Sequence, residues 1–167
     1  YENIDNLRNQ KSLTFLYRAP RIQLQPLNIS AMAARYRELF HMEENDSYQM
    51  ARLTKGYAFA FQVLGYLTYR SETRNYQNIL SEYRQYLDDF VYDKIWSELS
   101  PKDKRVMNAI ANCPDGKISH INSFLKLKKD EINPYRKRLI RKGIVNGNEY
   151  GILRSTLPLF DEFVLEQ

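Results

Sequence analysis

Apolar residues recur every three or four positions through most of this chain, which is the spacing of amphipathic helices. The pattern begins after Asn28, a residue type that caps helices, and predicts a helix that extends through Phe40. It predicts three more helices, over residues 47–54, 58–69 and 75–99. We therefore expect a mainly α fold.

The segment before Asn28 has weaker periodicity. In RIQLQPL, Ile22 and Leu24 alternate with polar residues and Pro26 ends the run, which predicts a short strand. We expect residues 1–99 to form one domain, in which this strand leads into four helices.

A second domain is predicted to begin at Ser100. Its hydroxyl is placed to cap a helix, Pro101 occupies the first helical position, and Asp103 in the first turn suits the helix dipole. The periodicity then predicts helices over 101–112, 119–127 and 132–142, with a one-residue strand contact at Ile118.

The third of these helices is followed by a turn-rich segment. Gly143 suits a helix C-terminus, and Asn146-Gly147-Asn148 predicts the turn of a hairpin with strands at 144–145 and 150–154. A last short helix is expected over 158–164. Three helices followed by a hairpin is the order of a winged helix-turn-helix, so residues 100–167 are predicted to be a winged-helix domain.

The charge of the chain is concentrated in this second domain. Residues 101–142 hold 12 Lys and Arg against 4 Asp and Glu, whereas residues 1–100 hold 12 of each sign. A basic block confined to one domain indicates a localised surface for a polyanion. DNA is therefore the expected partner.

Projection of the third helix at 100° per residue separates two faces. Ile132, Tyr135 and Leu139 fall on the apolar side, and Arg136 projects onto its margin. Guanidinium and ammonium groups suit phosphates and guanine edges. The residues expected to contact DNA are those of the opposite face and the hairpin: Asn133, Lys137, Arg138, Arg141, Asn146 and Asn148. The alternative is an ordinary charged outer face, or a winged helix used for protein contacts.

The sequence offers no constellation for catalysis. It lacks a G-x-x-x-x-G-K-[ST] phosphate loop, and His41 and His120 are isolated from other metal-binding residues. We expect no enzyme activity from these residues alone. The single Cys113 fits a reducing cytoplasm, and no apolar run approaches the length of a membrane span. Because the chain begins with Tyr1, we expect it to be part of a longer protein.

Three segments of the first domain resemble bacterial and archaeal AAA+/STAND-type P-loop ATPases, in particular those similar to origin-recognition initiators. They are TFLYRAPRIQLQPL, the helix that ends near Met42, and ARLTKGYAFAFQVLGYL. The resemblance covers nearly all of residues 12–156. It implies a helical lid and a winged helix that follow a nucleotide-binding core missing from this chain. ATP and magnesium are then implied for the parent protein, and none for these residues.

The same resemblance places Arg18, Gly56 and Tyr57 near the nucleotide in the parent protein. The sequence departs from the family at Ala58, where proline is expected, and it has no sensor arginine there. A second possibility is a protein-interaction or regulatory oligomerisation module that does not bind DNA. The 13 tyrosines of the chain are consistent with such a surface.

Overall fold

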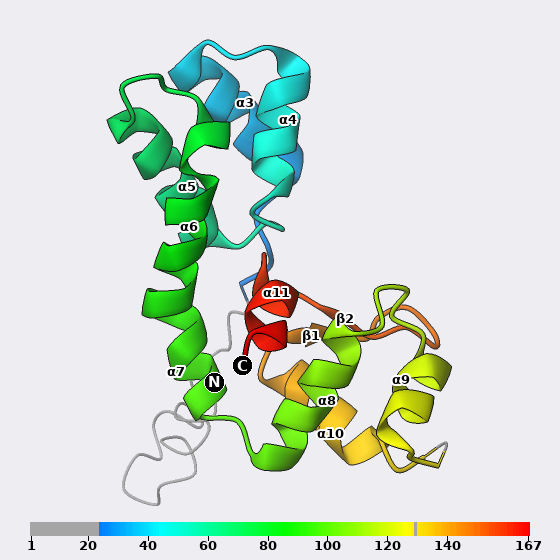
Figure 1. Ribbon diagram of the computed structural model, residues 1–167. Helices are drawn as coiled ribbons and strands as arrows, with labels where there is room; N and C mark the ends of the chain where they lie inside the picture. The colour runs from blue at the N-terminus through cyan, green and yellow to red at the C-terminus, as the bar shows by residue number, and fades with distance from the viewer. Residues whose placement is uncertain (1–23, 129) are drawn as a thin grey trace, which may run out of the picture.

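The computed structural model of the chain describes residues 24–128 and 130–167. Figure 1 shows a helical module, a helical column that leads away from it, and a second module that carries a small sheet. The predicted mainly α fold class is confirmed for these residues. No helix among them is both long enough and apolar enough to cross a bilayer.

The first module consists of α3 (Ile29–Phe40), α4 (Glu44–Arg52) and α5 (Ala58–Arg70). The side chain of Asn28 caps α3 by accepting a hydrogen bond from the amide of Ala31 at 3.0 Å, as predicted. Tyr36 is buried between the helices, and its hydroxyl donates to the Phe61 carbonyl at 2.7 Å. That hydrogen bond satisfies the polar atom of a core tyrosine.

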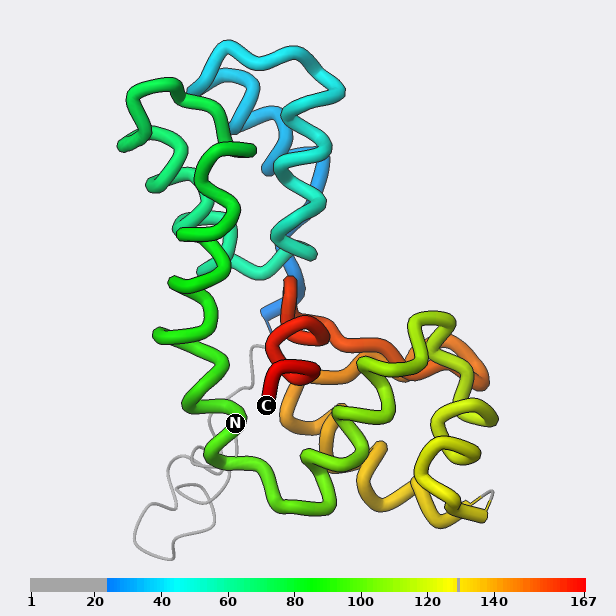
Figure 2. The backbone as a smooth tube through the Cα atoms, viewed as in Figure 1, coloured from blue at the N-terminus to red at the C-terminus, as the bar shows by residue number. Residues whose placement is uncertain are grey.

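Four helical segments then run end to end as a column: η2 (Tyr76–Ile79), α6 (Leu80–Leu87), the π-helical η3 (Asp88–Tyr92) and α7 (Asp93–Ser97). Figure 2 shows the continuous path of this column toward the second module. The side chain of Asn75 accepts from the amide of Gln77 at 2.9 Å and so begins the first turn. The long helix predicted over 75–99 is thus confirmed, with a π-helical turn inside it.

The second module contains α8 (Pro101–Ala111), α9 (Ile118–Leu125) and α10 (Asn133–Arg141). The strands β1 (Val145–Asn146) and β2 (Arg154–Ser155) follow and pair antiparallel, with Val145 opposite Ser155. An isolated antiparallel bridge joins Lys117 to Ile152. The strand contact predicted at Ile118 therefore lies one residue earlier.

A C-terminal segment, here called the clasp (residues 157–166), returns from β2 to the column and includes α11 (Phe160–Leu165). The Tyr92 hydroxyl donates to the carbonyl of Pro158, and the rings of Tyr92 and Phe160 lie 4.9 Å apart. Lys55 Nζ donates to the carbonyl of Leu157 at 3.0 Å. The clasp thus joins the second module to the column and to the first module.

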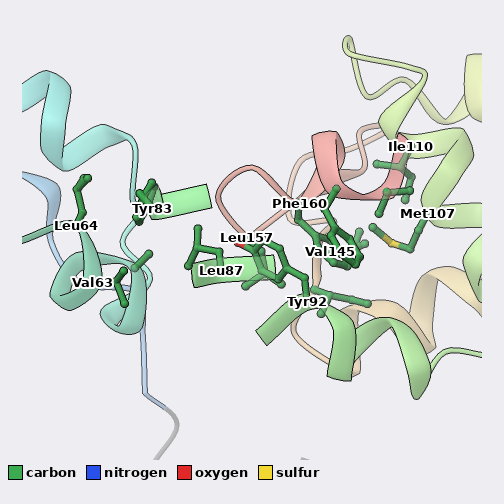
Figure 3. Packing of buried hydrophobic residues seen from close by; sticks show 14 of the residues in the cluster. Val63, Leu64, Tyr83, Leu87, Tyr92, Met107, Ile110, Val145, Leu157 and Phe160 are labelled. Atoms are coloured by element: carbon green, nitrogen blue, oxygen red, sulfur yellow. The ribbon is translucent and has the colours of Figure 1, made fainter. Parts of the chain in front are cut away.

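A single series of buried apolar side chains runs through both modules. Figure 3 follows it from Leu64 in α5, past Leu87 in the column, to Phe160 in the clasp and Met107 in α8. Each of these four side chains is fully buried. The column and the clasp therefore belong to the core.

Two predicted elements differ from the structure. Residues 24–27 form no strand; instead the Leu27 amide donates to the carbonyl of Gly56 at 2.8 Å, and the earlier part of the predicted strand lies outside the described residues. The hairpin has no tight Asn-Gly turn, because residues 147–153 separate its strands. The Leu153 amide donates to the Gly116 carbonyl at 2.7 Å, which holds the loop open against the segment before α9.

Candidate nucleic-acid interface

The basic helix α10 is fixed to the module by its apolar side. Ile132 and Leu139 are fully buried, as the projection predicts, and Pro134 lies in the first turn, where its missing N–H is not needed. Beyond the helix, Gly143 has a φ of +76° and its amide donates to the Ile140 carbonyl at 2.9 Å. The predicted glycine C-terminus is therefore confirmed.

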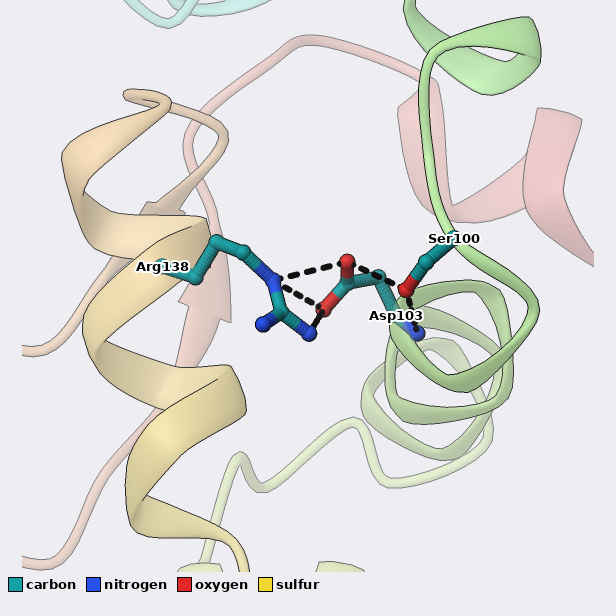
Figure 4. Close-up of polar contacts among 3 residues, drawn as sticks. All are labelled: Ser100, Asp103 and Arg138. Carbon is teal, nitrogen blue, oxygen red and sulfur yellow. Dashed lines mark hydrogen bonds and ion pairs between the residues drawn. The ribbon is translucent and has the colours of Figure 1, made fainter.

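Arg138 does not point into solvent with the other cations of α10. Its guanidinium faces α8 and grips the carboxylate of Asp103, with Nη2 2.6 Å from Oδ1 and Nε 2.9 Å from Oδ2 (Figure 4). The hydroxyl of Ser100 donates to the same carboxylate at 2.7 Å, and it also accepts from the Asp103 amide. Ser100 is therefore the predicted cap of α8, and Asp103 is the centre of a buried network.

The electrostatics of Asp103 follow from its surroundings. The carboxylate is buried, which by itself would raise its pKa, but hydrogen bonds from Arg138 and Ser100 and the charge of Arg138 hold the pKa below its ordinary value. The Asp103 side chain is 2% exposed and that of Arg138 is 34% exposed. Assignment of Arg138 to the outer face was therefore wrong, because a long side chain at the edge of the helix reaches the unpaired carboxylate on α8.

Arg136 links α10 to the loop between the strands, here called the wing (residues 147–153). Its Nη2 donates to the carbonyl of Gly147 at 2.9 Å. A Cβ at Gly147 would lie 2.7 Å from Ile140 Cδ1 and 3.1 Å from that same Nη2, so a larger residue there would have to displace the ends of these two side chains. Arg136 therefore positions the wing, a role that the projection onto the apolar margin did not reveal.

Lys137 and Arg141 are the cations that α10 presents to solvent. Both are exposed, and neither has a hydrogen bond or ion pair within the described part of the chain. Asn133 is half-buried, and its amide contacts Asp130 Oδ1 at 3.4 Å. Of the four residues predicted on this face, Lys137 and Arg141 are the two whose charges are free to bind an anion.

The wing begins beside this helix at Gly147 and carries polar and aromatic groups. Asn146 and Asn148 are both exposed, but the Asn146 side chain accepts from the Asn148 amide at 2.9 Å and so shapes the start of the wing. Tyr150 is fully exposed. Tyr150 was not among the residues predicted to contact DNA, and its place between Asn148 and Gly151 in a turn-rich segment was the available signal.

The connection from α9 to α10 adds further positive charge. Lys126, in the left-handed conformation, and Lys128 are both exposed, and the Lys128 amide donates to Glu131 Oε2 at 2.8 Å. Both lysines belong to the basic block of residues 101–142, but neither was among the residues predicted to contact DNA. They extend the positive surface from α10 to the preceding loop.

Two of the three residues predicted near a nucleotide, Gly56 and Tyr57, lie in the first module. Gly56 is buried with a φ of +77°, and a Cβ there would lie 2.8 Å from the Leu27 carbonyl oxygen. Tyr57 is half-buried, where burial raises the pKa of its hydroxyl, and Arg18 lies outside the described residues. The chain's own Pro26 and Leu27 therefore occupy the space beside Gly56. No cluster of three or more metal-binding side chains occurs within residues 24–128 and 130–167.

A family model described as "Domain of unknown function (DUF8462)" matches residues 89–164. The matched segment begins in η3 and ends in α11. Tyr92 of η3 and Phe163 of α11 pack with ring centroids 5.6 Å apart. The matched segment therefore includes the second module, here also called the basic module, and the residues on both sides of its contact with the column. No curated protein and no solved structure matches the chain.

Proposed function

We propose that residues 100–156 form a winged helix that binds duplex DNA through α10 and the wing. The supporting observation is the exposure of Lys137 and Arg141, two cations without a partner in the part of the chain that the structure describes, on a helix whose other arginines hold the fold. The bridge between Lys117 and Ile152 pairs the segment before α9 with the loop of the hairpin, in the manner of a third strand. Helix, strand contact, helix, helix and hairpin is the element order of a winged helix.

The chemistry of this surface favours contact with the phosphate backbone. Lysine and exposed arginine bind phosphates as charges whatever the base sequence, and exposed asparagines in the wing can donate to phosphate oxygens. Arg138, the residue best suited by its planar fork to read a guanine, is occupied by Asp103. The proposed binding is therefore strongly salt-dependent and weakly selective for sequence.

We also propose that the first module acts as the lid of an AAA+/STAND-type ATPase in the parent protein, and that it couples nucleotide state to DNA binding. This proposal rests on the resemblance of residues 14–67. The clasp would supply the mechanical link, since Lys55 of the first module contacts it directly. ATP and magnesium would bind to the nucleotide-binding core, and this chain would contribute no catalytic group.

Titration of duplex DNA at several salt concentrations tests the DNA proposal. We expect log K to fall linearly with log salt, with a slope of about −0.9 for each phosphate neutralised. A double Lys137→Ala and Arg141→Ala variant should reduce the slope by about 2 and weaken binding to all duplexes alike. Arg52→Ala, an exposed arginine on α4, is the matched control. Absence of binding at low salt would exclude the proposal.

A specific observation favours the second candidate, a protein-interaction module. Tyr66 and Tyr69 on α5 are more than half exposed, and the guanidinium groups of Arg70 and Arg74 lie 5.5 and 5.4 Å from the centres of their rings. Exposed tyrosine and arginine are enriched in protein interfaces. If substitution of Tyr66 and Tyr69 by Ala leaves binding to a protein partner unchanged, this surface is not the protein interface.

A further inference from the structure

We propose that the chain associates with a second copy of itself, and that a basic groove beside α8 receives an acidic, aromatic ridge on the column of the other copy. The groove has a volume of about 300 Å³ and lies where α7, α8, α9 and α11 meet. Its lining includes the apolar Trp96, Phe124, Leu125 and Val164 together with the cations Lys104 and Arg105.

The cations of the α8 groove are available to an incoming anion. Lys104 Nζ lies 4.9 Å from the centre of the Trp96 ring, and Arg105 is exposed without a carboxylate partner among the described residues. Among residues 24–128 and 130–167, no acidic side chain lines the groove. Phe124 is 51% exposed, so the rim also presents an unburied aromatic ring. This combination selects an apolar side chain flanked by negative charge.

The column of the same chain carries such a surface, here called the Phe90 ridge (Tyr86, Asp89, Phe90 and Asp93). Phe90 is 66% exposed, and its ring centre lies 5.3 Å from that of Tyr86. Asp89 precedes Phe90 and Asp93 follows it by about one turn; both are exposed and neither has an ion-pair partner in the described part of the chain. Lys94 follows, so carboxylates outnumber cations beside Phe90 by two to one.

The groove and the ridge lie on successive turns of the same column, since the ridge ends at Asp93 and the groove begins at Trp96. Tyr92 is buried against α11, which bounds the groove through Val164. Phe90, two residues earlier on the column, points to the opposite side and is exposed. Because the ridge and Trp96 belong to one continuous helical column, the ridge cannot fold back into the groove of its own copy, and the two surfaces can meet only between copies. Such a contact is heterologous, because each copy offers one groove and one ridge, and it generates rings or open chains.

The groove is separate from the proposed DNA-binding face. On α8, Asp103 faces α10, whereas Lys104 and Arg105 follow at about 100° and 200° around the helix. A single-stranded nucleic acid would also favour aromatic rings beside cations. The second copy is preferred because the groove is apolar beneath its two charges and because this chain itself carries the complementary ridge.

Sedimentation velocity over a wide range of protein concentration tests the proposal. We expect the average sedimentation coefficient of the wild-type chain to rise with concentration. The groove variant Lys104→Glu with Arg105→Glu and the ridge variant Asp89→Lys with Asp93→Lys should each weaken self-association at least tenfold. An equal mixture of the two variants should associate again, because each supplies the charge that the other has lost. Circular dichroism of each variant checks the fold.

Three results would overturn the inference. The wild-type chain could remain monomeric at all concentrations, or the charge-reversal variants could associate as the wild type does. The groove variant could instead lose binding to single-stranded DNA while its self-association is unchanged, which would identify the groove as a nucleic-acid site. Duplex binding by the Lys137 and Arg141 face is measured separately, so failure of one proposal does not imply failure of the other.

Discussion

Arg138 on α10 and Asp103 on α8 are 35 positions apart in the chain, and they form a two-pronged ion pair in the interior of the basic module. The pair fixes the orientation of α10 relative to α8, and so it determines where Lys137 and Arg141 point. Because Ser100 caps α8 through the same carboxylate, the start of one helix and the middle of another share one network. Arg138, which was predicted to contact DNA, thus positions Lys137 and Arg141, which remain exposed.

Arg138→Ala should destabilise the protein by about 2–3 kcal/mol, because it leaves the buried carboxylate of Asp103 without its countercharge. The estimate lies at the low end for buried pairs since Arg138 is partly exposed. Lys137→Ala, the neighbouring control, should change stability by less than about 0.5 kcal/mol. Urea unfolding measures both. Equal stability of the two variants would show that the ion pair does not stabilise the fold.

The pH dependence of stability should reveal the same carboxylate. Since the folded pKa of Asp103 is lower than its unfolded value, its contribution is fully present above the unfolded pKa of about 3.9 and is lost as pH falls through the folded pKa. The difference in unfolding free energy between wild type and Asp103→Asn should therefore be constant near neutral pH and shrink in acid. Urea unfolding at a series of pH values tests this. A difference that grows as pH falls would contradict the assignment.

Arg136→Ala should loosen the wing without unfolding the module. The substitution removes the hydrogen bond to the Gly147 carbonyl, which costs about 1 kcal/mol, and leaves α10 anchored by Leu139. Hydrogen exchange should become faster in residues 146–153 and remain unchanged in α8. Arg141→Ala, on the exposed face of the same helix, should leave exchange in the wing as it is. Unchanged protection of the wing in the Arg136 variant would mean that other contacts position it.

Tyr92→Phe should weaken the attachment of the clasp. The hydroxyl donates to the Pro158 carbonyl in a buried site, so its loss leaves an unsatisfied carbonyl and should cost about 1–3 kcal/mol. Tyr48→Phe is the control, because no hydrogen bond of the Tyr48 hydroxyl occurs in the described part of the chain. Thermal unfolding compares the two. A Tyr92 variant as stable as the control would show that ring packing alone holds the clasp.

The helices could be predicted from the sequence because their signals are local. Asn28, Asn75 and Ser100 each place a side-chain acceptor just before an apolar periodic stretch, and all three cap helices in the structure. Gly143 likewise ends the basic helix at a left-handed residue. Such caps depend on residues within a few positions of one another, so they can be predicted from the sequence alone.

The functional face was harder to predict, because it depends on contacts between distant residues. The projection placed Arg138 on the outer face of α10, because the position of its partner, the Asp103 carboxylate, depends on how α8 packs. The wing also differs from the predicted hairpin, since the bond from Leu153 to Gly116 joins segments that are separate in the chain. Helical periodicity finds the face of a helix and does not show which charges on it are already paired.

Because of the clasp, the basic module is attached to the rest of the chain at two places. One attachment is covalent, from α7 through Ser100 into α8, and the other is the packing of residues 157–166 against Tyr92, with Lys55 bonded to Leu157. A module attached at one point can rotate about that point, whereas a module attached at two separate points rotates only together with the column. Any rotation of the column would therefore carry α10 and the wing with it, in the manner of a lever arm.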